Sequence, residues 1–322
     1  DVALYECQTE MKRLAINITD LYSQILEAKI KLYYSDLILE KLKKVYELKK
    51  ISYAKGEISL EELIKTEAQV ESTLKEQINV RRELSTYVSN LSWLIGKRLS
   101  YEDNFLDIPV KEISTFPFSE IITNLPEYKS RTKQVETLFQ RLKTINASFL
   151  PDVVLYARYD LYGSSFESFN NALENVRRTA LTTGIFITVP LFDGGKIWWE
   201  RKKVLYELKK QMEGVRDIEN EKGKEIEVLY LNYKETQNNL KKYENLLNYY
   251  KKIVQIEKKA YELGERSIIE LLEAEKDMLM IERDLRITTN TLANLTKKIE
   301  IETEGVLNHE GEFSIYCQSH MY

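Results

Sequence analysis

Two similar stretches of sequence determine how this chain is organised: YAKGEISLEEL at residues 53–63 and YELGERSIIEL at residues 261–271. They coincide at Tyr, Gly, Ser, Glu and Leu when the sequence is shifted by 208 residues. The same shift places Leu32 on Leu240 without a gap. Matches among Lys, Glu and Leu arise easily by chance in charged helices, whereas Tyr, Gly and Ser at one offset do not. The chain is therefore predicted to contain two copies of one repeat.

Each repeated stretch combines a helix end with the start of another helix. Glycine suits the left-handed position after a helix, and a serine N-cap followed by glutamate three residues later forms a capping box. The residues are Gly56, Ser59 and Glu62 in the first copy and Gly264, Ser267 and Glu270 in the second. Each copy is therefore predicted to be a helical hairpin.

Apolar residues before each turn recur in alternating steps of three and four, which is the period of a coiled coil. The stripe mixes Leu and Ile with Tyr, Thr, Ala and Ser, so it suits a layered or curved helical wall better than a two-stranded zipper. The long helix of the second copy is predicted to begin near Lys196 and to end at Leu263, a length of about 100 Å.

Glycine and proline are scarce, with 11 Gly and 5 Pro in 322 residues, and every proline lies between residues 109 and 190. Proline-free arms on both sides favour helices, because proline costs about 3 kcal/mol in a helix interior. No apolar run approaches the roughly 20 residues of a membrane-spanning helix. The sequence therefore predicts a mainly α-helical chain that is not a helical membrane protein.

The charged and reactive side chains exclude several classes of function. Lys and Arg number 47 and Asp and Glu number 51, so no basic excess suggests nucleic-acid binding. Two His and two Cys are too few for most metal or thiol chemistry. Cys7 and Cys317 are either paired or free. We expect no enzyme activity, no catalytic residues, no metal site and no cofactor.

Two runs in the middle of the chain have the period of β-strands. Residues 153–162 alternate between an apolar and a more polar side, and residues 182–192 form a second run, with a polar loop at 163–180 between them. One interpretation is a soluble two-stranded ribbon packed on helices. The other is a membrane hairpin that joins further strands, because open strand edges are not tolerated in a bilayer.

At several motifs the chain resembles the TolC-type family of outer-membrane efflux proteins. The resemblance rests on Pro151-x-Val-x-Leu-x-Ala-x-Tyr159, on Gly184-x-Phe-x-x-x-Pro190-Leu-Phe-Asp-Gly-Gly195, on Asn124-Leu-Pro126-Glu127 and on the paired Tyr-x-x-Gly-x-x-Ser turns. It implies a homotrimer in which long coiled-coil hairpins form an α-barrel and β-hairpins form a transmembrane β-barrel.

The resemblance also implies a function, partners and a location. The function would be that of an exit duct for tripartite efflux, including multidrug or metal resistance, or for type I secretion. The partners would be a periplasmic adaptor, an inner-membrane pump of the resistance-nodulation-division or ABC type, and outer-membrane lipid, in a Gram-negative-type envelope. The competing hypothesis is a structural coiled-coil scaffold without transport activity.

The repeat and the strands together predict five segments. They are a first-repeat helical hairpin at 1–98, an inter-repeat connector and helix at 99–150, a transmembrane β-hairpin at 151–192, a second-repeat helical hairpin at 193–300 and a tail at 301–322. Family members contribute four strands per subunit. Moving the strands back by 208 residues places their first-copy equivalents before Asp1, so we expect this chain to lack the N-terminal strand hairpin.

The resemblance implies a gate at the second turn, with carboxylates at Glu270 and Glu273 facing a constriction. Three copies of each would make two anionic rings that attract multivalent cations, and crowding of like charges would raise their pKa values. The alternative is that Glu270 only caps its helix and that Glu273 is simply solvated.

A latch and an adaptor contact are also implied by the resemblance. Tyr261 and Arg266 match positions that hold the gate shut through an acidic residue aligned with Glu62; the alternative is a surface ion pair of at most about 1 kcal/mol. The turns would contact the adaptor through Gly56, Ser59, Gly264 and Ser267. Their alternative role is helix termination.

Overall fold

The computed structural model describes residues 2–113, 118–163, 168–170, 176–189 and 191–304. The chain forms two compact units. One consists mainly of residues 129–218, and the other of residues 3–128 together with the chain from Glu219 onward. They are described one after the other.

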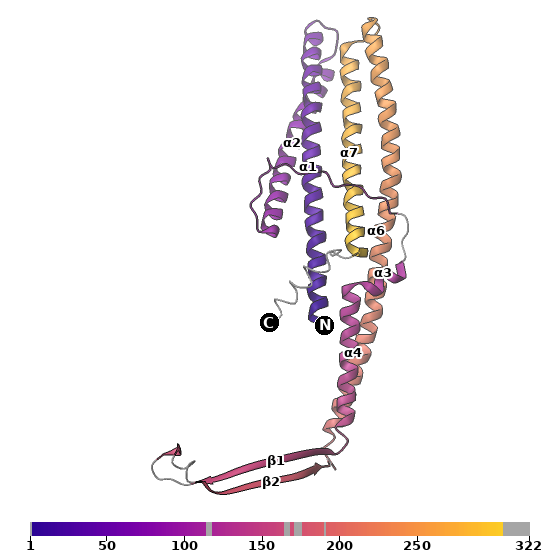
Figure 1. The fold of residues 1–322 in the computed structure, drawn as a ribbon. Coiled ribbons are helices and arrows are strands. Elements are labelled where there is room, and N and C mark those ends of the chain that lie inside the picture. The colour runs from indigo at the N-terminus through magenta and orange to yellow at the C-terminus, as the bar shows by residue number, and fades with distance from the viewer. Residues whose placement is uncertain (1, 114–117, 164–167, 171–175, 190, 305–322) are drawn as a thin grey trace. The chain divides into compact units, whose positions relative to one another are not determined.

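The larger unit is a row of four long helices. It contains α1 (Val2–Ala54), α2 (Leu60–Ile95), the short α3 (Phe118–Asn124), the second part of α6 (Lys196–Glu262) and α7 (Ile268–Glu304). Figure 1 shows α1 and α7 side by side, with α2 and α6 at the outer edges of the row and both hairpin turns at the same end. The predicted helical hairpins and the predicted long helix from Lys196 are confirmed.

Each hairpin has its own buried core, and the two cores are built at equivalent positions of the repeat. The buried members of the first core include Ile25, Leu84 and Leu91, and those of the second are Tyr233, Leu292 and Ile299. Every member of the second set lies 208 residues after its counterpart in the first. The repeat seen in the sequence is therefore a repeat of packing.

The two hairpins meet along α1 and α7, which run antiparallel and form many polar contacts. Lys41 Nζ lies 2.6 Å from Glu275 Oε2. Farther from the turns, the amide of Asn290 donates to the backbone oxygen of Ser23 at 2.9 Å. We call this contact the α1–α7 seam. Because its polar groups must meet their partners, they hold the two helices in one register.

A buried lysine lies near the start of the α1–α7 seam. Lys12 is 4 % exposed, and its Nζ lies 2.7 Å from Glu127 Oε1 and 2.9 Å from Glu302 Oε2. Glu127 stands at the beginning of α4 (Pro126–Ala147), and Glu302 stands near the end of α7. One cation therefore connects three helices and balances two carboxylates that are largely removed from water.

The smaller unit contains α4 from residue 129 onward, the first part of α6, and the antiparallel strands β1 (Asp152–Gly163) and β2 (Val176–Thr188). Hydrogen bonds join α4 to α6, such as Arg131 Nη1 to Gln211 Oε1 at 2.9 Å. In the strand pair, Leu155 lies opposite Ile185. The predicted β-hairpin is confirmed.

The predicted limits of the second strand were wrong. β2 begins at Val176 rather than at 182, so residues 176–180 belong to the strand and not to the loop, and it ends at Thr188 rather than at 192. It stops two residues before Pro190, which has no backbone N–H for a ladder. Asp193 then caps α6, because its Oδ2 accepts from the Ile197 N–H at 2.6 Å.

Replacing Lys12 with alanine should destabilise the protein by about 3 kcal/mol, because Glu127 and Glu302 would lose the cation between them. Denaturation followed by helical circular dichroism gives the free energy of unfolding. Arg13→Ala is the matched control, since Arg13 is an exposed neighbour with only a 3.9 Å contact to Glu10. Equal stability of the two variants would contradict this role of Lys12.

Candidate functional site

The candidate site is the end of the larger unit where the two hairpin turns lie. Gly56 and Gly264 both have φ of 78°, the left-handed conformation that was predicted. After α6, the N–H of Gly264 donates to the Tyr261 oxygen at 2.9 Å and the N–H of Glu265 donates to the Ala260 oxygen at 2.9 Å. These two bonds form a Schellman motif, which satisfies the last carbonyls of the helix.

Both serines cap the helix that follows them, as predicted. Ser59 Oγ accepts from the Glu62 N–H at 3.2 Å, and Ser267 Oγ accepts from the Glu270 N–H at 3.3 Å. In the second turn, Glu270 Oε2 also accepts from the Ser267 N–H at 2.9 Å, which completes a capping box. The Glu62 carboxylate instead faces Lys49, so the two turns differ in their charged groups.

Glu270 is held by its own turn. In addition to the cap, its Oε1 accepts from Arg266 Nη1 at 2.7 Å. The pKa of Glu270 is lowered, first by the hydrogen bond from the Ser267 backbone and then by the one from Arg266, and the same link to Glu270 raises the pKa of Arg266. The expected rise in carboxylate pKa concerned three copies around an axis. Within one chain the pKa of Glu270 is lowered instead.

Glu273 is bound by a residue that the sequence reasoning missed. Lys49 Nζ lies 3.1 Å from Glu273 Oε1 and 3.6 Å from Glu62 Oε1. The Lys49 side chain is only 12 % exposed. It therefore connects α1 to α2 and to α7 beside the turns. A signal was present in the sequence, because the shift of 208 residues places Lys49 on Glu257, a reversal of charge.

The three predicted latch residues are near the turns but have other partners. Arg266 is paired with Glu270 on its own turn, and Glu62 faces Lys49. Tyr261 lies in the last turn of α6 and is exposed. The structure gives no direct pair between Arg266 and Glu62 among the residues that it describes. A latch built from these residues therefore stays a prediction.

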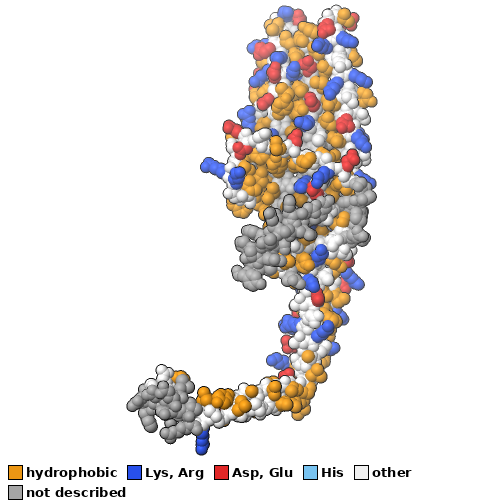
Figure 2. Space-filling view, in the orientation of Figure 1, with side chains coloured by type: hydrophobic (Ala, Val, Ile, Leu, Met, Phe, Trp, Pro, Cys, Tyr) orange, Lys and Arg blue, Asp and Glu red, His pale blue; other side chains and the backbone are white. Residues whose placement is uncertain are grey.

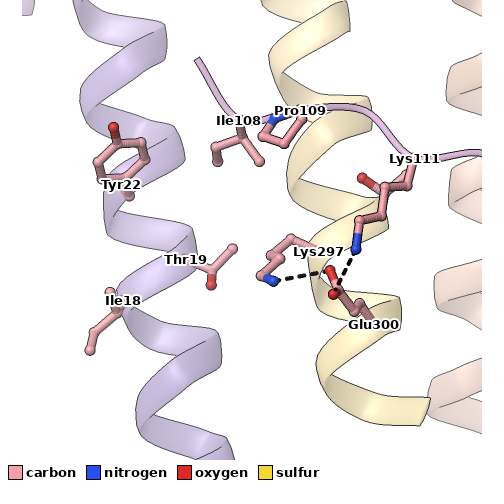
Figure 3. Close-up of a pocket in the computed structure, with 9 residues that line it drawn as sticks. Ile18, Thr19, Tyr22, Ile108, Pro109, Lys111, Lys297 and Glu300 are labelled. Atoms are coloured by element: carbon pink, nitrogen blue, oxygen red, sulfur yellow. Dashed lines mark hydrogen bonds and ion pairs between the residues drawn. The ribbon is translucent and has the colours of Figure 1, made fainter. Parts of the chain in front are cut away.

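A separate cavity of about 390 Å³ lies between α1, the connector before residue 113, and α7. Figure 3 shows Ile18, Tyr22 and Pro109 around this cavity. It also shows Lys111 and Lys297 directed toward Glu300. Glu300 accepts from Lys111 at 2.9 Å and from Lys297 at 3.0 Å. Burial alone would raise the pKa of Glu300, but the hydrogen bonds from these lysines lower it overall. The cations are thus engaged within the chain, and we assign the cavity to packing of the connector.

The described ranges contain no cluster of three or more His, Cys, Asp or Glu side chains arranged to hold a metal ion. None of the helices within those ranges is sufficiently long and apolar to cross a membrane. Cys7 lies in α1. Cys317 and both histidines fall in the stretch after residue 304, outside the described residues.

The family of the chain is shown by comparison with known sequences. The family model described as "Outer membrane efflux protein" matches residues 119–294, more than half of the chain. The chain therefore belongs to the outer membrane efflux protein family, whose members are channels. No curated protein matched its sequence.

Solved structures of outer membrane channels have the same fold. The Campylobacter jejuni channel CmeC has a TM-score of 0.76 at 17 % identity, and the match covers 99 % of this chain and 68 % of that chain. The Vibrio cholerae protein VceC has a TM-score of 0.74 at 18 % identity, covering 94 % and 72 %. The open state of Neisseria gonorrhoeae MtrE has a TM-score of 0.66 at 14 % identity, covering 89 % and 66 %. The helical hairpins therefore have the α-barrel fold of efflux channels.

Gly264→Ala should destabilise the protein by about 1 kcal/mol, because an L side chain is strained at positive φ. A Cβ at this position would meet no atom within 4 Å, so crowding adds nothing. Thermal unfolding measures the loss. Gly264→Asn is the control and should lose less, since asparagine tolerates the left-handed conformation. Unchanged stability of the alanine variant would show that the turn does not require this conformation.

Proposed function

We propose that this chain is the subunit of a passive exit duct in the outer membrane, acting in tripartite efflux or type I secretion as a homotrimer. A periplasmic adaptor and an inner-membrane pump of the resistance-nodulation-division or ABC type would supply the substrate and the energy. The observation that carries the proposal is the pair of helical hairpins with capped turns at one end, in a chain of the outer membrane efflux protein family.

The β-hairpin supports the outer-membrane part of the proposal. One face carries Leu155, Leu161, Leu181, Ile185 and Ile187, all of them exposed. Figure 2 shows hydrophobic side chains along the strand pair. An uncovered apolar face of this kind is costly in water and suits contact with lipid when further strands close the sheet. We infer that hairpins from several copies share one barrel.

The turns support the gate and the adaptor contact. Glu270 and Glu273 lie in the first turns of α7, where three copies around an axis would form two carboxylate rings. The turn residues Gly56, Ser59, Gly264 and Ser267 are all exposed. Leu60 and Leu263 beside them are exposed as well. Apolar side chains at a capped, exposed turn suit the helical tips of an adaptor.

In planar lipid bilayers the purified protein should form channels, and Tyr261→Phe combined with Arg266→Ser should raise their conductance. Loss of Arg266 frees Glu270 from its 2.7 Å partner and removes polar links available for holding the closed turn. Arg13→Ser is the control, because it removes an exposed arginine of α1 remote from the turns. Unchanged conductance would count against the latch, whereas a trimer that forms no channels would count against the duct.

Neutralising the proposed ring should weaken block by multivalent cations. We expect Glu273→Gln to raise the concentration needed for half block by roughly tenfold, which corresponds to about 1.4 kcal/mol. Glu61→Gln is the control, because Glu61 is an exposed carboxylate of the other turn region, paired with Lys65 on its own helix. Current recordings with increasing trivalent cation measure the effect. If the cation blocked both variants at the same concentration, the proposed position of Glu273 at the constriction would be wrong.

A further inference from the structure

The two edge helices of the larger unit expose apolar side chains. Figure 1 shows α2 and α6 at the two ends of the helix row. Ile64 and Ile78 of α2 are exposed, and so are Leu246 and Ile253 of α6. Along this part of the unit the structure describes one hairpin partner for each of these helices, α1 for α2 and α7 for α6, and these side chains stay exposed.

The repeat shows what covers equivalent positions elsewhere in the chain. Ile38 and Val45 lie three and four residues from Lys41, whose Nζ contacts α7, so they share the α1 face that carries the seam. They are 3 % and 2 % exposed, and Leu272, three residues before Glu275 on α7, is 8 % exposed. A shift of 208 residues places them on Leu246, Ile253 and Ile64. The edge helices α6 and α2 thus carry the same apolar pattern as α1 and α7. A seam of the same construction between α6 and α2 would bury it.

One charged pair of the seam, the one beside the turns, is also repeated, with its polarity reversed. Lys49 and Glu273, 3.1 Å apart in the seam, correspond to Glu257 and Lys65. Lys65 is 70 % exposed, and its contact is to Glu61 on its own helix. Glu257 is partly exposed, and its Oε2 has no hydrogen-bond partner in the described part of the chain, although its charge acts on Arg266. Each member of the second pair is therefore placed to gain from the other.

We propose that α6 of one copy packs against α2 of a second copy in the register of the α1–α7 seam, with Glu257 of the first copy paired with Lys65 of the second. The proposal rests on the homotrimeric duct and names the residues that join its subunits. The partner is a second copy of this chain. The seam within a chain and the seam between chains then alternate around the ring, which is a heterologous contact that closes.

The reversed charges of the second pair favour contact of α6 with α2 over the other pairings between copies that the repeat would allow. If α1 met α2 of another copy in the same register, Lys49 would face Lys65. If α6 met α7 of another copy, Glu257 would face Glu273. Both alternatives place like charges opposite each other, so they are disfavoured by repulsion. In this register, opposite charges meet when the long helix of one repeat (α1 or α6) packs against the shorter helix of the other repeat (α7 or α2).

Zero-length carbodiimide coupling of the full-length protein in detergent tests the pairing directly, because it joins a lysine to a carboxylate that touches it. The expected product is a Lys65–Glu257 link, identified by mass spectrometry in a species of at least two copies. The Lys49–Glu273 link serves as the internal control and should occur in the single-copy species. Finding the Lys65–Glu257 link only within single copies would overturn the proposal.

Charge reversal separates this pairing from the duct itself. Lys65→Glu removes the amine that the coupling needs, so its effect is measured as trimer dissociation in detergent, and the association constant between copies should fall by about fivefold. The added change Glu257→Lys should restore a trimer that resists dissociation. Lys43→Glu, an exposed lysine of α1, is the control and should have no effect. A conducting trimer that is indifferent to these changes would overturn the pairing but leave the duct intact. A monomeric protein would overturn both.

Discussion

The α1–α7 seam is the contact on which the larger unit depends, because it joins two hairpins that each have a core of their own. Buried apolar residues on the α1 face that carries Lys41, such as Val45, favour contact between the helices but tolerate sliding. The polar pairs do not, since a shifted helix would leave Lys12 or Asn290 buried without its partner. The seam therefore sets the register that brings both turns to the same end.

The sequence predicted the hairpins because their ends are local. Gly56 with Ser59, and Gly264 with Ser267, form helix ends and caps through neighbours within a few residues. The strand pair was predicted from its period of two for the same reason. The limits of β2 were not, because they depend on cross-strand pairing at Val176 and on the cap that Asp193 provides for α6.

The site was predicted less completely than the fold. The cap of Glu270 follows from the spacing of the turn, whereas the pairing of Glu273 depends on Lys49, which lies 224 residues away in sequence. A resemblance transfers a position, but it does not transfer the partner of that position. The clue lay in the one repeat position where a lysine of α1 corresponds to a glutamate of α6.

The pairing of Lys12 with Glu302 has a consequence for the order of folding. These residues are 290 apart in sequence, so the contact closes a loop that contains most of the chain. Loop closure of this length is entropically costly, and proteins rich in distant contacts fold slowly. The first hairpin can form its own core as soon as Leu91 is synthesised. Lys12 can pair with Glu302 only after the end of α7 has been synthesised. Until then, the face of α1 that packs on α7 has no partner helix.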